Sequence, residues 1–397
     1  MNDYEILEQL PERQFLDNDL YKMTMLWFVM NYYPNAKVRY DFIDRNNNKY
    51  PAGLGRILRK RIDTFRDMKL SKEHRLAFQK KCYFLPNIFF DFLEGYRVDP
   101  SDVSISQDSE GCLSIYCENF WYKTILWEII IMSEVAEINF LMTGEIPDKT
   151  REELKDYNIQ KGVKLRMNDV PFVDFGTRRR YSFENQKNVI QDLIIGGGDK
   201  FIGTSNVYLS ILYDIKLIGT AAHELTCGVA TKLGYEHANG NLMKMWNDLF
   251  HGSLGIVLPD SFGLKSFLND FDGVYARLYD GTRHDSGDPY KYADTLIDHY
   301  GKYNINPTTK TIAFSNALDV DKAIELSDYC RGKISMTACI GTHFTCDVGV
   351  KPLNIVMKLT MLDGKHVIKL SDEAGKHTGE KRIIELVKEL INYEPLG

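Results

Sequence analysis

The sequence predicts an α/β protein in which an irregular parallel α/β barrel is inserted into an α+β domain built from both chain ends. From about residue 165, a short apolar run, a polar or glycine-bearing turn and a helix-like stretch recur seven times. Before that point no repeat is present, and after Gly349 the pattern is that of a hairpin and a helix. We expect the α+β domain over residues 1–140 and 349–397, and the barrel over 141–348.

The composition is that of a folded chain with two or three domains. The 397 residues are 44% hydrophobic and 26% charged, which excludes disordered and fibrous classes. A net charge of −6 without a block of like charges argues against nucleic acid as a partner. The longest apolar stretches, 23–30 and 125–132, are shorter than the ~20 residues of a membrane helix, and no secretory signal is visible. We expect a cytoplasmic protein whose seven cysteines are reduced thiols.

The first third is predicted to contain a buried helix and two strands. Asp17 or Asp19 can cap a helix over 20–30, whose apolar residues lie on more than one side. Residues 38–43 alternate like a half-buried strand. Residues 112–117 and 122–131 indicate a second strand followed by a helix.

The tail is predicted to return to this first third. Two apolar segments, 353–359 and 366–370, flank an Asp-Gly pair that is typical of a tight hairpin turn. Residues 381–391 then carry apolar side chains at helical spacing.

The seven polar turns of the repeat are expected to meet on one face, because loops that follow parallel strands lie at the same end of the sheet. The turns read Asp174-Phe-Gly-Thr-Arg-Arg-Arg180, Gly203-Thr-Ser-Asn206, Gly219-Thr-Ala-Ala-His223, Leu258-Pro-Asp-Ser261, Arg283-His-Asp-Ser-Gly-Asp288, Phe314-Ser-Asn-Ala-Leu-Asp319 and Gly341-Thr-His343.

Several of these turns suit a phosphorylated ligand. Three Gly-Thr turns offer backbone N–H groups and hydroxyls at helix starts, where the helix dipole favours an anion. The arginine triplet 178–180 adds guanidinium groups for bidentate contact with phosphate. Capped turns and a solvated basic run are the structural alternatives. The common location of the Gly-Thr turns and the arginine triplet on one face favours phosphate binding.

Two further turns carry candidate chemistry. Asp285 and Asp288 have the oxygen-rich spacing of a Mg²⁺ site shared with substrate phosphates, although a turn with a helix cap is equally compatible. His223 is either a structural histidine or a nucleophile or acid–base group beside the anion site. The residues alone therefore indicate an enzyme whose rim binds a small molecule with several phosphates and Mg²⁺.

These motifs, taken in order, resemble the nicotinate phosphoribosyltransferase family over nearly the whole chain. The resemblance also includes Asp19-Leu-Tyr-Lys22 and Val350-Lys-Pro-Leu-Asn-Ile-Val356. It implies a type II phosphoribosyltransferase fold and a homodimer with active sites at the interface. It also implies ATP-coupled formation of nicotinate mononucleotide and pyrophosphate from nicotinate and 5-phosphoribosyl 1-pyrophosphate, a step of NAD salvage.

The resemblance also implies roles for individual residues. His223 matches the histidine that ATP phosphorylates, and Arg283 matches the arginine that pairs with the nicotinate carboxylate. Tyr21 is similar to the tyrosine that stacks on the pyridine ring, reaching into the partner subunit's site. Asp285 and Asp288 would bind Mg²⁺, the ribose hydroxyls or both. The other implied substrate-binding residues are Phe175, Arg178, Arg179, Ser205, Asn206, Thr220, Ser286, Ser315 and Asp319, with Gly341 and Thr342 at the ribose 5-phosphate.

Two positions depart from the family pattern. Cys339 replaces a glycine beside the phosphate turn, which would cost on the order of 1 kcal/mol if the backbone needs a positive φ there. Asn316 replaces a carboxylate. Three alternatives stay open: a nicotinamide phosphoribosyltransferase, a non-catalytic homologue that binds phosphoribosyl pyrophosphate, and an aldolase-like barrel. The last would need a lysine at a strand end, which the seven turns lack.

Overall fold

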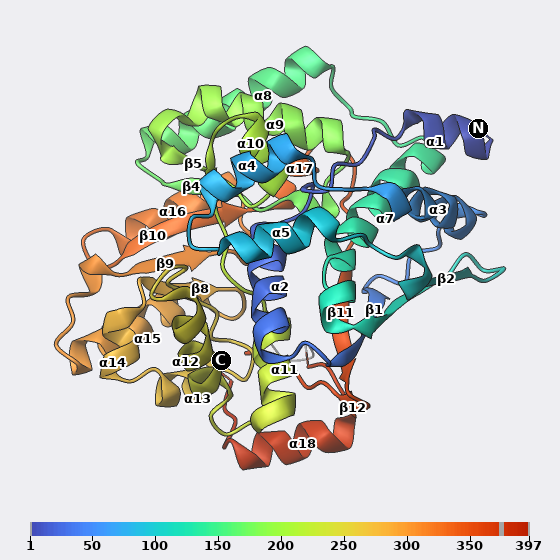
Figure 1. Cartoon of the computed structure of the whole chain (residues 1–397). Coiled ribbons are helices and arrows are strands. Elements are labelled where there is room, and N and C mark those ends of the chain that lie inside the picture. The colour runs from blue at the N-terminus through green and yellow to red at the C-terminus, as the bar shows by residue number, and fades with distance from the viewer. Residues whose placement is uncertain (1, 373–376, 396–397) are drawn as a thin grey trace.

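Two β-sheets organise the chain in the computed structural model, which describes residues 2–372 and 377–395 (Figure 1). The parallel sheet has seven strands in the order β6-β5-β4-β10-β9-β8-β7. Each of the seven predicted turns follows one of these strands, so the predicted repeat is confirmed. The strands are β4 Phe172–Asp174, β5 Phe201–Thr204, β6 Lys216–Leu217, β7 Ile256–Val257, β8 Gly281–His284, β9 Thr311–Phe314 and β10 Ser335–Ile340.

Helices follow these strands and cover the outside of the sheet (Figure 1). They are α9 Phe183–Gly197, α10 Val207–Leu212, α11 His223–Leu233, α12 Ala238–Phe250, α13 Leu264–Asp270, α14 Gly273–Leu278, α15 Pro289–Lys302, α16 Val320–Cys330 and α17 Thr342–Thr345, and α8 Arg151–Met167 precedes β4.

The barrel is open between its two edge strands. The strand order begins with β6 and ends with β7, so backbone pairing does not complete the ring in the part of the chain described. Thr220, just after β6, donates its hydroxyl to the carbonyl of Ile256 in β7 at 2.9 Å. A side chain thus bridges the seam at the rim.

Close strand packing explains two glycines of the barrel. A Cβ on Gly203 would lie 1.9 Å from the carbonyl oxygen of Lys216, and one on Gly281 would lie 1.8 Å from that of Thr311. Neither contact is sterically possible, so these positions require glycine.

The antiparallel sheet joins both ends of the chain, in the order β12-β11-β1-β3-β2. Its strands are β1 Lys37–Asp44, β2 Val103–Gln107, β3 Leu113–Phe120, β11 Ile355–Leu362 and β12 Lys365–His366. Because β1 pairs with both β3 and β11, the predicted return of the tail is confirmed. Asp363 (φ 47°) and Gly364 (φ 77°) form the predicted hairpin turn, with the positive φ values that such turns need. The domain boundaries at residues 140 and 348 stay a prediction.

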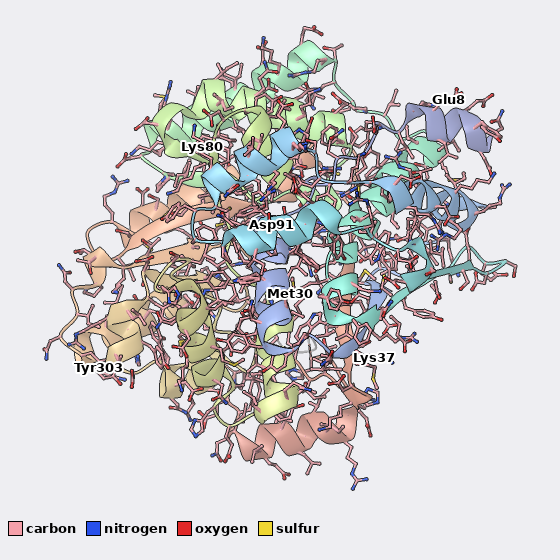
Figure 2. All side chains as sticks on the ribbon, in the orientation of Figure 1. Glu8, Met30, Lys37, Lys80, Asp91 and Tyr303 are labelled. Carbon is pink, nitrogen blue, oxygen red and sulfur yellow. The ribbon has the colours of Figure 1, made fainter. Side chains whose placement is uncertain are left out.

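Helix α2, Leu20–Tyr32, packs between the two sheets (Figure 1). Its buried residues lie on every side, which explains the apolar pattern in the sequence. Side chains fill the space around it, and one buried apolar cluster extends through both sheets (Figure 2). The other helices are α1 Asp3–Gln9, α3 Leu54–Asp63, α4 Lys72–Lys81, α5 Asn87–Gly95, α6 Trp121–Thr124, α7 Trp127–Thr143 and α18 Lys381–Leu390. None of the described helices is both long and apolar enough to span a bilayer.

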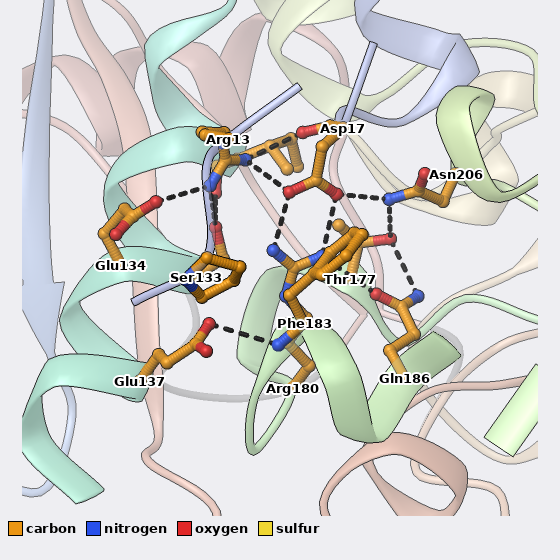
Figure 3. A network of polar contacts seen from close by, with 12 residues as sticks. Arg13, Asp17, Ser133, Glu134, Glu137, Thr177, Arg180, Phe183, Gln186 and Asn206 are labelled. Atoms are coloured by element: carbon orange, nitrogen blue, oxygen red, sulfur yellow. Dashed lines mark hydrogen bonds and ion pairs between the residues drawn. The ribbon is translucent and has the colours of Figure 1, made fainter. Parts of the chain in front are cut away.

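A buried ionic network fastens the barrel to the N-terminal segment (Figure 3). Arg180 makes two hydrogen bonds to the Asp17 carboxylate, at 2.7 and 2.6 Å. Asp17 also accepts from the amide of Asn206 at 2.8 Å, and Arg13 joins the same cluster to Glu134 of α7. The third arginine of the triplet is therefore a core residue, which corrects the expectation that all three serve a phosphate.

We predict that Asp17→Asn lowers the free energy of unfolding by about 3–5 kcal/mol, because it leaves buried guanidinium groups without their anion. Burial opposes ionisation, but Arg180 and Arg13 hold the pKa of Asp17 well below its usual range. Its contribution is therefore complete above the unfolded pKa of ~3.9 and is lost as the pH falls.

Urea unfolding of both proteins between pH 7 and pH 3 checks this prediction. The stability gap between wild type and variant should narrow below about pH 4. Asp321→Asn, which removes an exposed partner of Lys164, is the control and should change stability by less than about 0.5 kcal/mol. A gap that is absent, or that does not change with pH, would contradict the account.

Candidate active site

Three adjoining cavities open at the carboxyl ends of the parallel strands. The barrel cavity, about 210 Å³, lies inside the sheet. The outer cleft, about 590 Å³, lies between the rim and β11, and a rim niche of about 70 Å³ adjoins both. Arg178 lines all three.

The barrel cavity combines aromatic walls with the largely buried guanidinium of Arg283. Tyr21, Phe175 and Arg283 line it, with Ser205 and Thr220 at the same rim. The Arg283 guanidinium lies 5.7 Å from the Phe175 ring centre and donates to Ser315 at 2.8 Å and Asp285 at 2.9 Å. Burial disfavours its charge, but Asp285 raises the pKa of Arg283, so it stays a cation. Such a cavity suits a flat ring that carries a carboxylate.

The rim niche concentrates positive charge beside a helix start. Arg178 and Arg179 line it together with Gly341 and Thr342, where α17 begins. Burial and the neighbouring cations Arg178 and Arg45 lower the pKa of Arg179 to about 10. No carboxylate of residues 2–372 or 377–395 forms an ion pair with Arg179. Arg178 lies 3.5 Å from the Glu128 carboxylate, so of these two adjacent guanidinium groups Arg179 is the one without a paired carboxylate in the described part of the chain, and together they favour binding of a phosphate or pyrophosphate.

His223 begins α11 and faces the outer cleft. Its Nε2 lies 2.7 Å from Asp260 Oδ1, and Asp285 Oδ2 lies 3.8 Å away. Asp260 also accepts a hydrogen bond from Ser286 at 2.7 Å. Although burial opposes its charge, His223 and Lys369 hold the pKa of Asp260 well below its usual range. The carboxylate thus fixes one nitrogen of the imidazole.

Known proteins resemble this chain over almost its full length. The nicotinate phosphoribosyltransferase (NAPRTase) N-terminal domain matches residues 16–136, and the nicotinate phosphoribosyltransferase (NAPRTase) family matches residues 170–394. A nicotinate phosphoribosyltransferase of Desulforapulum autotrophicum is 42% identical, over 93% of this chain and 96% of the relative. One of Chromohalobacter salexigens is 40% identical, over 95% and 97%. The crystal structure of nicotinate phosphoribosyltransferase from Porphyromonas gingivalis has a TM-score of 0.93 at 34% identity, over 96% of this chain and 100% of that one.

The chain belongs to the nicotinate phosphoribosyltransferase family. This membership confirms the resemblance drawn from the motifs, and it excludes the aldolase-like alternative for the barrel.

Most of the residues predicted to bind substrate in this family member do line the three cavities. Tyr21 lines the barrel cavity of its own chain, and its reach into a partner's site stays a prediction. Gathered at the cavities are Tyr21, Phe175, Arg178, Arg179, Ser205, Thr220, His223, Arg283, Asp285, Ser286, Ser315, Gly341 and Thr342.

Three predicted residues lie elsewhere. Asn206 is fully buried, where it caps α10 and binds Asp17. Asp288 accepts hydrogen bonds from two backbone N–H groups as the cap of α15, and Asp319 caps α16 by accepting from the backbone N–H of Lys322. For Asp288 the helix-cap interpretation is therefore favoured over the Mg²⁺ interpretation. Among the described residues no group of three or more His, Cys, Asp or Glu side chains forms a metal site.

The structure adds functional candidates that no sequence motif singled out. Asp260 lies in a predicted turn after β7, so its position on the rim was a usable signal. Arg45, Lys369 and Glu128 reach the outer cleft from the antiparallel sheet, the tail and α7. No sequence motif near these residues predicted that they would reach the cleft.

The two departures from the family pattern have different outcomes. Cys339 lies within β10 and is absent from the residues with positive φ, so the expected strain does not arise. Burial raises the pKa of its thiol to about 12, which keeps it neutral beside Arg283. Asn316 lines the outer cleft, where it can offer an amide in place of a carboxylate.

We predict that Asp288→Asn changes neither the free energy of unfolding nor kcat appreciably, because asparagine caps a helix about as well as aspartate. Asp288→Ala should cost about 0.5–2 kcal/mol of stability through loss of the cap. Urea unfolding together with Mg²⁺ titration of the activity checks this. A raised Mg²⁺ requirement in Asp288→Asn would restore the metal-ligand interpretation.

Proposed function

We propose that the chain joins nicotinate to the phosphoribosyl group of 5-phosphoribosyl 1-pyrophosphate, forming nicotinate mononucleotide and pyrophosphate for NAD salvage, and that ATP drives this through a phosphohistidine at His223. The observation that carries the proposal is the adjacency of two kinds of site. A carboxylate-binding Arg283 sits beside aromatic rings in the barrel cavity, and Arg178 and Arg179 form an anion niche directly next to it.

The transfer follows from that adjacency. The pyridine nitrogen attacks C1 of the ribose while the bond from C1 to the pyrophosphate oxygen breaks. Positive charge develops on the ribose and negative charge on the departing pyrophosphate, which Arg178 and Arg179 would stabilise. The pyridine nitrogen already has a lone pair, so no general base is required. Gly341 and Thr342, at the start of α17, would hold the ribose 5-phosphate.

The ATP step is assigned to His223. Because Nε2 is bound to Asp260, the free lone pair would lie on Nδ1. That nitrogen would attack the γ-phosphorus of ATP, and the bond to the ADP oxygen would break. The new phosphoryl group brings about two negative charges to the cleft, where it would attract the rim arginines and order them for the sugar substrate.

Magnesium and the assembly state belong to the same proposal. Asp285, a carboxylate at the cleft, fits an ion held mainly by phosphate oxygens, and bound Mg²⁺ would neutralise charge on the pyrophosphate.

A homodimer remains a proposal that light scattering would check; Tyr21 reaches the cavity without one. A cytoplasmic location is supported by the seven unpaired cysteines, all of which the structure describes.

We predict that His223→Ala keeps the fold and slow transfer but loses ATP hydrolysis and the stimulation by ATP. Incubation with γ-labelled ATP should give an acid-labile, base-stable phosphate on the wild type and none on the variant. His237→Ala is the matched control, since it also removes a histidine paired with an aspartate at a helix start, but on the surface. Unchanged ATP dependence in His223→Ala would remove the phosphohistidine.

We predict that Arg283→Ala raises the KM for nicotinate roughly tenfold or more, because a charge-assisted hydrogen bond contributes about 1.5–3 kcal/mol. Steady-state kinetics with nicotinate and nicotinamide check this. Because nicotinamide lacks the carboxylate, its turnover by Arg283→Ala should be no lower than its turnover by the wild type. Equal KM values for nicotinate would place the carboxylate elsewhere. Wild-type turnover of nicotinamide alone would favour the nicotinamide enzyme, and tight binding without pyrophosphate release would favour the non-catalytic homologue.

A further inference from the structure

A buried lysine lies directly behind the site and has no assigned role. Lys22 is the residue after Tyr21 in α2, and its side chain is fully excluded from solvent. Its Nζ lies 2.5 Å from Glu128 of α7 and 2.8 Å from Glu224 of α11. Burial favours the neutral amine, but these two carboxylates raise the pKa of Lys22, so it is charged. Replacing a buried ion pair with apolar residues of similar volume often leaves a protein equally stable. The presence of this ion pair therefore suggests a role beyond folding.

One carboxylate in this cluster faces two cations. Lys22 contacts Oε2 of Glu128, while the guanidinium of Arg178 lies 3.5 Å from Oε1. Although burial opposes its charge, Lys22 and Arg178 hold the pKa of Glu128 below its ordinary value. A single negative charge is therefore divided between a fully buried cation and the arginine that lines all three cavities.

Helix α2 fixes this cluster relative to the rim. Thr24 donates its hydroxyl to the carbonyl of Thr220 at 2.6 Å, and the backbone N–H of Ala222 meets the sulfur of Met25 at 3.2 Å. Glu224 is held further by the hydroxyl of Tyr40 at 3.0 Å. Helix α2, which carries Lys22, is thus held against the segment that carries His223.

We propose that Lys22 is a positioning residue for phosphoribosyl transfer, which engages Glu128 and so leaves the Arg178 guanidinium available to a substrate phosphate. The inference rests on the proposed function, because it assumes that a phosphorylated substrate binds at Arg178. Without Lys22, the whole charge of Glu128 would attract Arg178 and compete with that phosphate. Removing Glu128 as well would release Arg178 again.

The test compares three variants by the KM for 5-phosphoribosyl 1-pyrophosphate and by the Kd for inorganic pyrophosphate measured by calorimetry. Lys22→Met should raise both values roughly tenfold, with a much smaller change in the KM for nicotinate. Glu128→Gln alone should lower both values. The double variant Lys22→Met/Glu128→Gln should return both to within about threefold of wild type.

Lys310→Met is the matched control. Lys310 is also a buried lysine, but it precedes β9 at the opposite end of the barrel, where it binds the carbonyls of Arg277 and Tyr279. Lys310→Met should lower stability. It should not change the KM for 5-phosphoribosyl 1-pyrophosphate or the Kd for pyrophosphate relative to the KM for nicotinate.

A purely structural Lys22 would give a double variant no better than Lys22→Met, and that result would overturn the inference. A rise in either constant for Glu128→Gln would also overturn the inference. If Lys22→Met does not fold, the Glu128→Gln variant alone decides the question. Failure of the proposed function would look different, since the wild type would then release no pyrophosphate from the two substrates. The calorimetric constants test the inference even in that case.

Discussion

The parallel direction of seven short strands is the constraint on which the rest of the structure depends. Every strand ends at the same rim, so residues more than a hundred positions apart in the sequence contribute to one set of cavities. The ring of backbone hydrogen bonds stops between β6 and β7, and the residue that bridges the seam, Thr220, also lines the barrel cavity. Closure of the barrel and the shape of its binding pocket are therefore linked at one side chain.

Burial and charge together assign different tasks to three consecutive arginines. Arg180 meets the carboxylate of Asp17 in the core and becomes part of the fold. Arg179 lies among cations and faces the rim niche, so its charge is left for a ligand. Arg178 lies between these cases, since it lines the cavities and also approaches Glu128. The surroundings of each guanidinium, rather than its residue type, separate a structural arginine from a binding one.

The fold and the core of the site could be predicted because both depend on local patterns. Apolar runs followed by polar turns marked all seven strands, and an Asp-Gly pair marked the hairpin. The pattern could not distinguish a turn carboxylate that faces a ligand, such as Asp285, from one that caps a helix, such as Asp288, because both follow a strand. The positions of Lys369 and Arg45 could not be predicted from the sequence, because only the packing of the second sheet brings them to the rim.

If one rim holds both substrates side by side, a crystal structure with nicotinate, pyrophosphate and Mg²⁺ will show them in adjoining cavities. The pyridine ring should lie against Tyr21 and Phe175, its carboxylate on Arg283, and phosphate oxygens on Arg178 and Arg179. Pyrophosphate bound away from these two arginines, or nicotinate bound outside the barrel cavity, would contradict this arrangement.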